Sequence, residues 1–170
     1  RLATARKKES QNICFVPDGN YADFMEERLG IKFGKGRIVD TKGALLGEHN
    51  GFIRYTIGQR RGLGVSSPHP LYVCGVDPAT NTVVAGRNEE LYSKTVTVKE
   101  INLIPFSYFE STMRVTAKLR YRQKAEGATV RQTDKDTLVL EFENPQRAAA
   151  KGQAAVLYDG EFVLGGGTIS

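Results

Sequence analysis

Short extended segments separated by turn residues constrain the fold of this chain most strongly. From residue 31 onward, apolar or alternating runs are punctuated by Gly, Asn, Asp and Pro, as in β-strands joined by tight turns. The runs are GRIVD, ALLGEHNG, RYTIG, PLYVCGVDPATNTVVAG, KTVTVKEINLI, TLVLEFE and AAVLYDGEFVLGG. In the last run, Asp159-Gly160 predicts a two-residue hairpin. A mainly β architecture follows.

One helix is expected, close to the N-terminus. Apolar residues recur at helical spacing within residues 20–30, and Gly30 follows them as a stop signal. Later, a hairpin closes before residues 91–94 and a fresh set of strands begins after them. We therefore expect a leader with the helix over 1–30, a small β-rich domain over 31–93 and a second β domain over 94–170.

Residues 113–124 alternate with a period of two, as in a half-buried strand. One face is expected to hold Met113, Val115, Ala117, Leu119 and Tyr121. The other face holds Arg114, Thr116, Lys118, Arg120, Arg122 and Lys124. Same-face side chains of a strand stand roughly 6.6 Å apart, so this basic face is suited to follow a nucleic-acid backbone. A solvated face, or an edge strand protected by charge, explains the pattern equally well.

Composition limits the kinds of partner that the chain is expected to have. The net charge of +5 is compatible with a polyanionic partner but does not identify one. No apolar run approaches the roughly 20 residues that cross a bilayer, and RLATARKKES lacks the apolar centre of a secretion signal, so no membrane partner is expected. The chain opens on Arg1 rather than Met, and we expect it to be part of a longer polypeptide.

Few residue patterns indicate chemistry. His49 and His69 have no Ser, Cys or carboxylate at motif spacing, and both are interpreted as loop residues. The cluster over residues 58–64, GQRRGLG, lacks the GK[ST] ending of a phosphate-binding loop, so we interpret it as a structural turn whose arginines can still touch an anion. The three glycines over 165–167 are interpreted as a strand kink or bulge.

The two cysteines differ in their surroundings. They lie far apart without a CxxC partner, which predicts neither a zinc site nor a disulfide framework and fits a reducing cytoplasm. Cys74 alternates inside a β run without a charged neighbour in sequence, so we expect it in the core. Cys14 follows Arg6, Lys7 and Lys8, and nearby cations favour a reactive thiolate. The residues alone leave open whether Cys14 is a buried strand residue or a nucleophile.

Several segments together resemble one family. They are KKESQNICFV (7–16), YADF (21–24), GEHNG (47–51), YTIGQRRGLG (55–64), LRYRQ (119–123), GQAAV (152–156) and LGGG (164–167). In this order and spacing they are similar to the tRNA-specific 2-thiouridylases, over essentially the whole chain. The resemblance implies a central β-rich domain followed by a C-terminal β-barrel. It also implies an N-terminal ATP-pyrophosphatase domain, whose SGGxDSS-type loop and first catalytic cysteine have no counterpart in this sequence.

The resemblance implies a role for Cys14. At the matching position the family carries sulfur as a persulfide, supplied by a cysteine desulfurase or a sulfur-relay protein. The full-length enzyme uses ATP and magnesium to adenylate O2 of the wobble uridine, and sulfur then replaces that oxygen. A disulfide between the two catalytic cysteines can form as sulfur is handed over. We expect no cofactor in this chain by itself, and we expect it to be a monomer.

The resemblance also implies tRNA contacts. Arg120 and Tyr121 match one tRNA-contacting segment, and Gln153 matches a second. The alternating pattern extends this set to Lys118 and Arg122, but it places Tyr121 on the apolar face, so its contact requires a backbone group or an irregular strand. The alternative is a non-catalytic RNA-binding β-barrel module, which we expect to describe the chain in isolation.

Overall fold

The computed structural model describes residues 21–121 and 123–170, and within these ranges the chain is mainly β, as predicted. The only α-helix of these ranges has nine residues, too few to span a bilayer. The helices are α1 (Tyr21–Leu29) and the 3₁₀ turns η2 (Phe52–Arg54) and η3 (Asn88–Leu91). The strands are β1 (Gly36–Val39), β2 (Leu45–His49), β3 (Tyr72–Asp77), β4 (Thr82–Gly86), β5 (Tyr92–Leu103), β6 (Met113–Lys118), β7 (Glu126–Asp134), β8 (Thr137–Arg147), β9 (Ala154–Asp159) and β10 (Phe162–Ile169).

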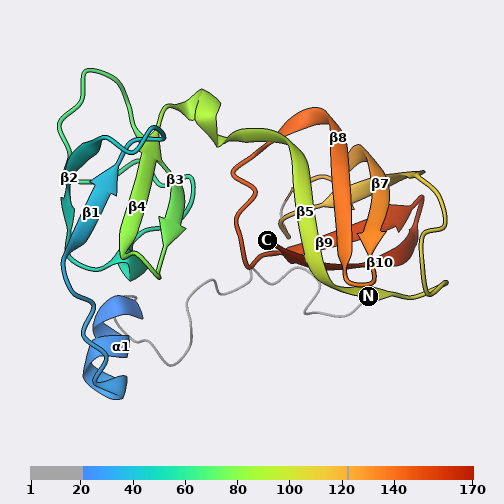
Figure 1. The fold of residues 1–170 in the computed structure, drawn as a ribbon, viewed down its shortest axis with the longest axis horizontal. Helices are drawn as coiled ribbons and strands as arrows, with labels where there is room; N and C mark the ends of the chain where they lie inside the picture. Colours follow the sequence, from blue (N-terminus) through green and yellow to red (C-terminus); the bar gives the residue numbers. More distant parts are fainter. Residues whose placement is uncertain (1–20, 122) are drawn as a thin grey trace, which may run out of the picture.

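The first half of the described chain forms a small sheet with α1 at one end (Figure 1). Its four strands lie in the order β2-β1-β4-β3, with β1 parallel to β4 and the other pairs antiparallel. Apolar side chains from the strands and from the loop between η2 and β3 form its core. They are Ile38, Leu63, Val73, Val83 and Ala85, all at most 5% exposed.

The second half forms a closed barrel of strands in the order β10-β5-β8-β7-β6-β9 (Figure 1). Alternate residues point inward, as Leu138, Leu140 and Phe142 of β8 show, because successive side chains of a strand face opposite sides. Closure removes the unpaired edges that an open sheet would expose. The barrel that the family resemblance implied is therefore confirmed.

One turn prediction holds, one predicted strand is absent, and one strand was not predicted. Asp159 pairs with Phe162 across a two-residue turn, which confirms the hairpin. The run RYTIG is not a strand, because its backbone closes a 3₁₀ turn through the Tyr55 N–H and the Phe52 carbonyl. Strand β7 was not among the expected runs. Most of its residues are polar, and of its inward-facing side chains only Ala128 and Val130 are apolar. The third, Gln132, is buried and accepts a hydrogen bond from the Phe109 N–H at 3.0 Å.

The sheet and the barrel meet where η3 leads into β5. The Ala148 N–H donates to the Leu91 carbonyl at 2.7 Å. Arg147 at the end of β8 reaches across to the sheet, with Nε 3.3 Å from the Asn88 side-chain oxygen and Cζ 5.5 Å from the centre of the Tyr72 ring. These contacts define the seam between the two parts.

Candidate nucleic-acid interface

The segment that follows β6 carries the expected RNA-contacting residues. The predicted alternation holds as far as Leu119, which is 2% exposed. It is wrong for Tyr121, whose side chain lies in solvent at 77% exposure. The physical reason is that β6 ends at Lys118, and the backbone then turns, with the Gln123 N–H donating to the Arg120 carbonyl at 3.1 Å.

The structure brings the expected residues from two distant segments together. Strand β6 runs antiparallel to β9 with Lys118 opposite Val156, so the residues after β6 lie beside the residues before β9. They line a hollow of about 430 Å³, which we call the Tyr121 hollow. Its walls are Thr56, Ile57, Leu119, Arg120, Tyr121, Gln153 and Ala154. Both the barrel and the loop after η2 therefore contribute to it.

Two cations lie at or beside the Tyr121 hollow. Arg120 is half-buried, and its guanidinium donates a hydrogen bond to the Ala148 carbonyl, next to the seam. Lys118 Nζ lies 5.7 Å from the centre of the Tyr121 ring, so Lys118 adjoins the hollow although it does not line it. The other two site residues predicted from sequence, Cys14 and Arg122, lie outside the described residues.

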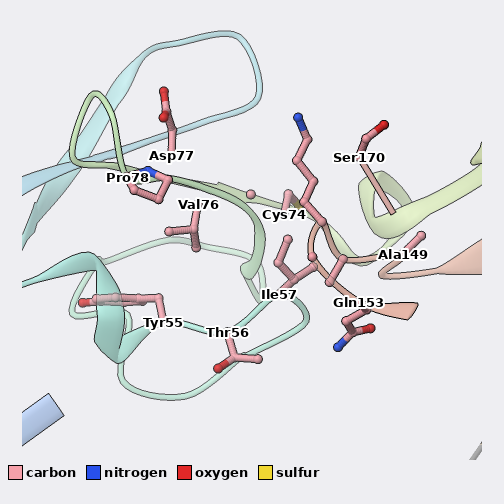
Figure 2. Close-up of a pocket in the computed structure, with 14 residues that line it drawn as sticks. Tyr55, Thr56, Ile57, Cys74, Val76, Asp77, Pro78, Ala149, Gln153 and Ser170 are labelled. Carbon is pink, nitrogen blue, oxygen red and sulfur yellow. The ribbon is translucent and has the colours of Figure 1, made fainter. Parts of the chain in front are cut away.

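A larger cavity lies at the seam, and we call it the seam cavity (Figure 2). It has a volume of about 820 Å³ and is lined by residues 55–57, by β3 and the turn after it, by the β8–β9 loop and by Ser170. Its polar side chains include Asp77 and Lys151, which the sequence reasoning did not single out. Neither belongs to a recognisable motif, and only the fold places them at one cavity.

Cys74 is one of the residues that line the seam cavity, and its expected place in the core is wrong. A bulge in β3 between Val73 and Gly75 leaves Val73 fully buried and Cys74 only half-buried. The fold also gives Cys74 a charged neighbour that the sequence does not suggest. Burial, and then the nearby Glu90 carboxylate, raise the pKa of the Cys74 thiol, so the thiol stays protonated at neutral pH.

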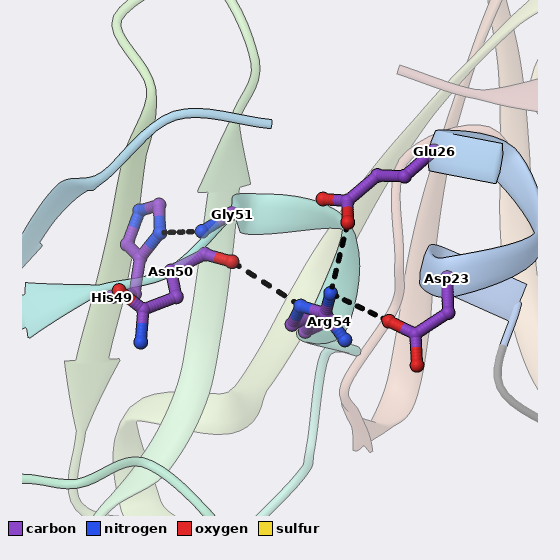
Figure 3. A network of polar contacts seen from close by, with 6 residues as sticks. All are labelled: Asp23, Glu26, His49, Asn50, Gly51 and Arg54. Carbon is purple, nitrogen blue, oxygen red and sulfur yellow. Dashed lines mark hydrogen bonds and ion pairs between the residues drawn. The ribbon is translucent and has the colours of Figure 1, made fainter. Parts of the chain in front are cut away.

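His49 is also not a loop residue, because it ends β2 and is 2% exposed. Its Nδ1 accepts a hydrogen bond from the Gly51 N–H at 3.1 Å, and its Nε2 has no hydrogen-bond partner among the residues that the structure describes (Figure 3). A Cβ at Gly36 would lie 2.6 Å from that ring, so the position requires glycine. The imidazole ring is therefore packed against the backbone of β1 at Gly36 and has a structural role. His69, in contrast, lies exposed in a bend, as expected.

Arg54 fastens α1 to the sheet (Figure 3). Its guanidinium lies 2.8 Å from the Asp23 carboxylate and 3.5 Å from that of Glu26, and its Nε donates to the Asn50 carbonyl. All three side chains are partly exposed, so each pair contributes about 1 kcal/mol or less. The contact nevertheless joins α1 to the sheet directly.

The glycine cluster over 58–64 is a structural turn, as predicted. Gly58, Gly62 and Gly64 adopt positive φ, and the Gln59 side chain bridges the turn by accepting from the Thr56 N–H and donating to the Arg61 carbonyl. Among the described residues no three His, Cys, Asp or Glu side chains are grouped as metal ligands.

Two family descriptions match the chain in succession. Residues 22–87 match the family described as tRNA methyl transferase PRC-barrel domain. Residues 93–169 match the family described as Aminomethyltransferase beta-barrel domain. The first match covers the sheet with α1, and the second covers the barrel.

Known proteins resemble the chain over almost its whole length. It is 45% identical to the tRNA-specific 2-thiouridylase MnmA of Lachnoclostridium phytofermentans, 43% to that of Clostridioides difficile and 45% to that of Acetivibrio thermocellus. Each comparison covers 99% of this chain but only 46–47% of the relative, so the chain spans about half the length of the curated relatives it matches. The chain therefore contains these two family domains in succession, and over its length it is similar to one part of the tRNA-specific 2-thiouridylases.

Proposed function

We propose that this chain is the tRNA-docking and sulfur-carrying part of an enzyme that replaces O2 of the wobble uridine in tRNA with sulfur. The observation that carries the proposal is the Tyr121 hollow, where Arg120, Tyr121 and Gln153 converge from two segments. The names of the relatives supply the substrate class, since each is a tRNA-specific 2-thiouridylase.

The chemistry of the hollow suits RNA. Lys118 and Arg120 provide positive charge to neutralise phosphates, which positions an RNA strand without reading its sequence. The exposed Tyr121 ring offers a face on which an unpaired base can stack, a contact worth roughly 1–3 kcal/mol. The Gln153 amide can donate to sugar or phosphate oxygens and accept from a 2′-hydroxyl group.

In the parent protein, sulfur would come from Cys14. A cysteine desulfurase or a relay protein would leave a persulfide on this residue, and ATP would activate the uridine by adenylating O2. The outer persulfide sulfur would bond to C2 while the C2–O2 bond breaks and AMP leaves. The first catalytic cysteine of the missing domain would then release the sulfur from Cys14 by forming a disulfide with it. We place this reaction in the cytoplasm and expect a monomer.

The second candidate, a module that only binds RNA, applies to the chain in isolation. It is favoured by the RNA-compatible surface of the described residues. Thiolation of tRNA by the isolated chain, given ATP and a sulfur donor, would contradict this second candidate.

Binding of the chain to an unmodified tRNA transcript with uridine at the wobble position tests the docking surface. We expect Tyr121→Ala to weaken binding about tenfold, because a stacking face is lost. We expect Lys118→Gln to lower the slope of log K against log [salt] by about 0.7–0.9, as the loss of one phosphate contact does. Tyr108→Ala is a matched control, because Tyr108 is an exposed tyrosine outside the hollow.

Equal weakening by the Tyr108 and Tyr121 variants would show that the hollow is not the docking site. In the full-length parent, Cys14→Ser should abolish thiolation and leave tRNA affinity nearly unchanged. Retained thiolation would exclude Cys14 as the persulfide residue, whereas the assignment of the tRNA-docking surface would be unaffected.

A further inference from the structure

The Tyr121 hollow and the seam cavity adjoin each other. They share three lining residues, Thr56, Ile57 and Gln153. In the seam cavity, Thr56 and Gln153 lie on one side, while Asp77 and Ser170 lie on the other (Figure 2). An RNA strand that leaves the Tyr121 hollow past Gln153 would therefore enter the seam cavity, between the sheet and the barrel.

Charge is distributed unevenly around the seam cavity. Lys151 is exposed on the barrel side, two residues from Gln153. Asp77 lies on the sheet side, where its carboxylate accepts hydrogen bonds from Thr80 Oγ1 at 2.6 Å and from the Ala79 N–H at 3.0 Å. The Thr80 bond is the largest cause that lowers the pKa of Asp77, the positive charge of Lys151 across the cavity is the smallest, and the carboxylate remains ionised at neutral pH. Asp77 therefore also offsets part of the charge that Lys151 presents to an anion. An anion is therefore attracted toward Lys151 and repelled from the β3 wall.

Much of the remaining wall of the cavity is apolar. Ile57, Val76, Pro78 and Ala149 supply surface against which ribose and base faces can lie. Sequence readout needs hydrogen-bonding side chains aimed at base edges, whereas phosphate and sugar contacts need only charge and simple donors. The arrangement therefore fits the backbone of an RNA strand of any sequence.

We propose that the seam cavity binds the sugar–phosphate backbone of the tRNA strand that continues from the Tyr121 hollow. Lys151 neutralises a phosphate, and the Thr56 hydroxyl group contacts a backbone oxygen between the two hollows. The proposal rests on the proposed function, because it takes tRNA as the occupant of the Tyr121 hollow. It adds the central sheet to the docking surface and assigns Lys151, Thr56 and Asp77 a part in binding.

Substitution of the two charged residues tests the proposal in the chain itself, with the same tRNA transcript as probe. Lys151→Gln should weaken binding about threefold to tenfold, the range for one charge-assisted contact at a partly exposed site. It should also lower the salt slope by about 0.7–0.9, to a similar extent for transcripts of different sequence. Asp77→Asn removes the repulsive charge and should tighten binding by about twofold to fivefold.

Lys135→Gln is the matched control. Lys135 is an exposed loop lysine before the start of β8, whereas the seam lies at the end of that strand. Far-ultraviolet circular dichroism checks that each variant is folded.

Equal effects of the Lys151 and Lys135 variants, or weaker binding by Asp77→Asn, would overturn the proposal. Wild-type affinity in Lys151→Gln together with weak binding in Tyr121→Ala would overturn it while leaving the proposed function intact. Wild-type affinity in both variants would overturn the function as well.

Discussion

Cys74 shows how the fold sets the reactivity of a single residue. Its thiol donates to the carbonyl oxygen of Tyr72 at a sulfur–oxygen distance of 3.6 Å and faces a cavity that solvent reaches. Burial is the larger cause of its raised pKa, and the Glu90 carboxylate is the smaller. Since only the thiolate is a strong nucleophile, the raised pKa makes the accessible Cys74 thiol a weak nucleophile at neutral pH.

The pH dependence of alkylation tests this description of Cys74. In a Cys14→Ser background Cys74 is the sole thiol of the chain. The rate of reaction with iodoacetamide should rise with a midpoint above the value of about 8.5 for a free cysteine, because the raised pKa delays formation of the thiolate. Glu90→Gln should move the midpoint down only part of the way, since burial remains. Glu89→Gln is the control, and a wild-type midpoint at or below that of a free cysteine would contradict the description.

At the level of elements, the glycines of β10 allow the barrel to close. Gly166 pairs with Val156 of β9 on one side and with Asn102 of β5 on the other. A Cβ at this position would lie 2.0 Å from the Ala155 carbonyl oxygen, far inside contact distance. The register with β5 shifts between Gly166 and Thr168, which confirms the bulge expected from the glycine run.

Gly166→Ala should therefore destabilise the chain by about 2–3 kcal/mol, because the added methyl group forces the two backbones apart. The measurement is urea unfolding followed by far-ultraviolet circular dichroism, since the chain has no tryptophan. Gly34→Ala is a matched control, because a Cβ there meets nothing within 4 Å and φ is not positive. The control should be neutral or slightly stabilising. Equal midpoints for the two variants would show that β9 and β10 do not approach as closely as described.

The sequence predicted those features that depend on neighbours in the chain. The alternation of β6 as far as Leu119, the hairpin at Asp159 and the turn around Gln59 all follow from local residue order. It did not predict the exposure of Tyr121, because the end of β6 depends on a turn with no Gly or Pro to mark it. It also missed Lys151 and the carboxylate beside Cys74, because contacts between distant segments decide both. The assignments of Cys14 and Arg122 stay predictions.

The relation between sheet and barrel matters for the whole molecule, because the Tyr121 hollow and the seam cavity take walls from both parts. Arg147 contacts Tyr72 and Asn88, and a Cβ at Gly58 would lie 3.4 Å from its guanidinium. The neighbouring Ala148 connects Arg120 to Leu91 through its carbonyl and its N–H. A change at the seam should therefore alter both the mobility of the linking segment and the binding of RNA.

Arg147→Ala should loosen the seam. It removes a partly buried cation from the face of the Tyr72 ring, and it removes the hydrogen bond that Arg147 donates to the Asn88 side-chain oxygen. Two trypsin sites, Arg87 and Lys94, are exposed on either side of η3, so limited proteolysis reports on this segment. Cleavage there should become several-fold faster, since proteolysis follows the population of locally opened states. The affinity for tRNA should fall in parallel, because the sheet and barrel walls of the seam cavity would move apart and would no longer contact the same RNA strand. Arg131→Ala, on the exposed face of β7, should change neither quantity. Faster cleavage with unchanged affinity would mean that the barrel alone docks the RNA.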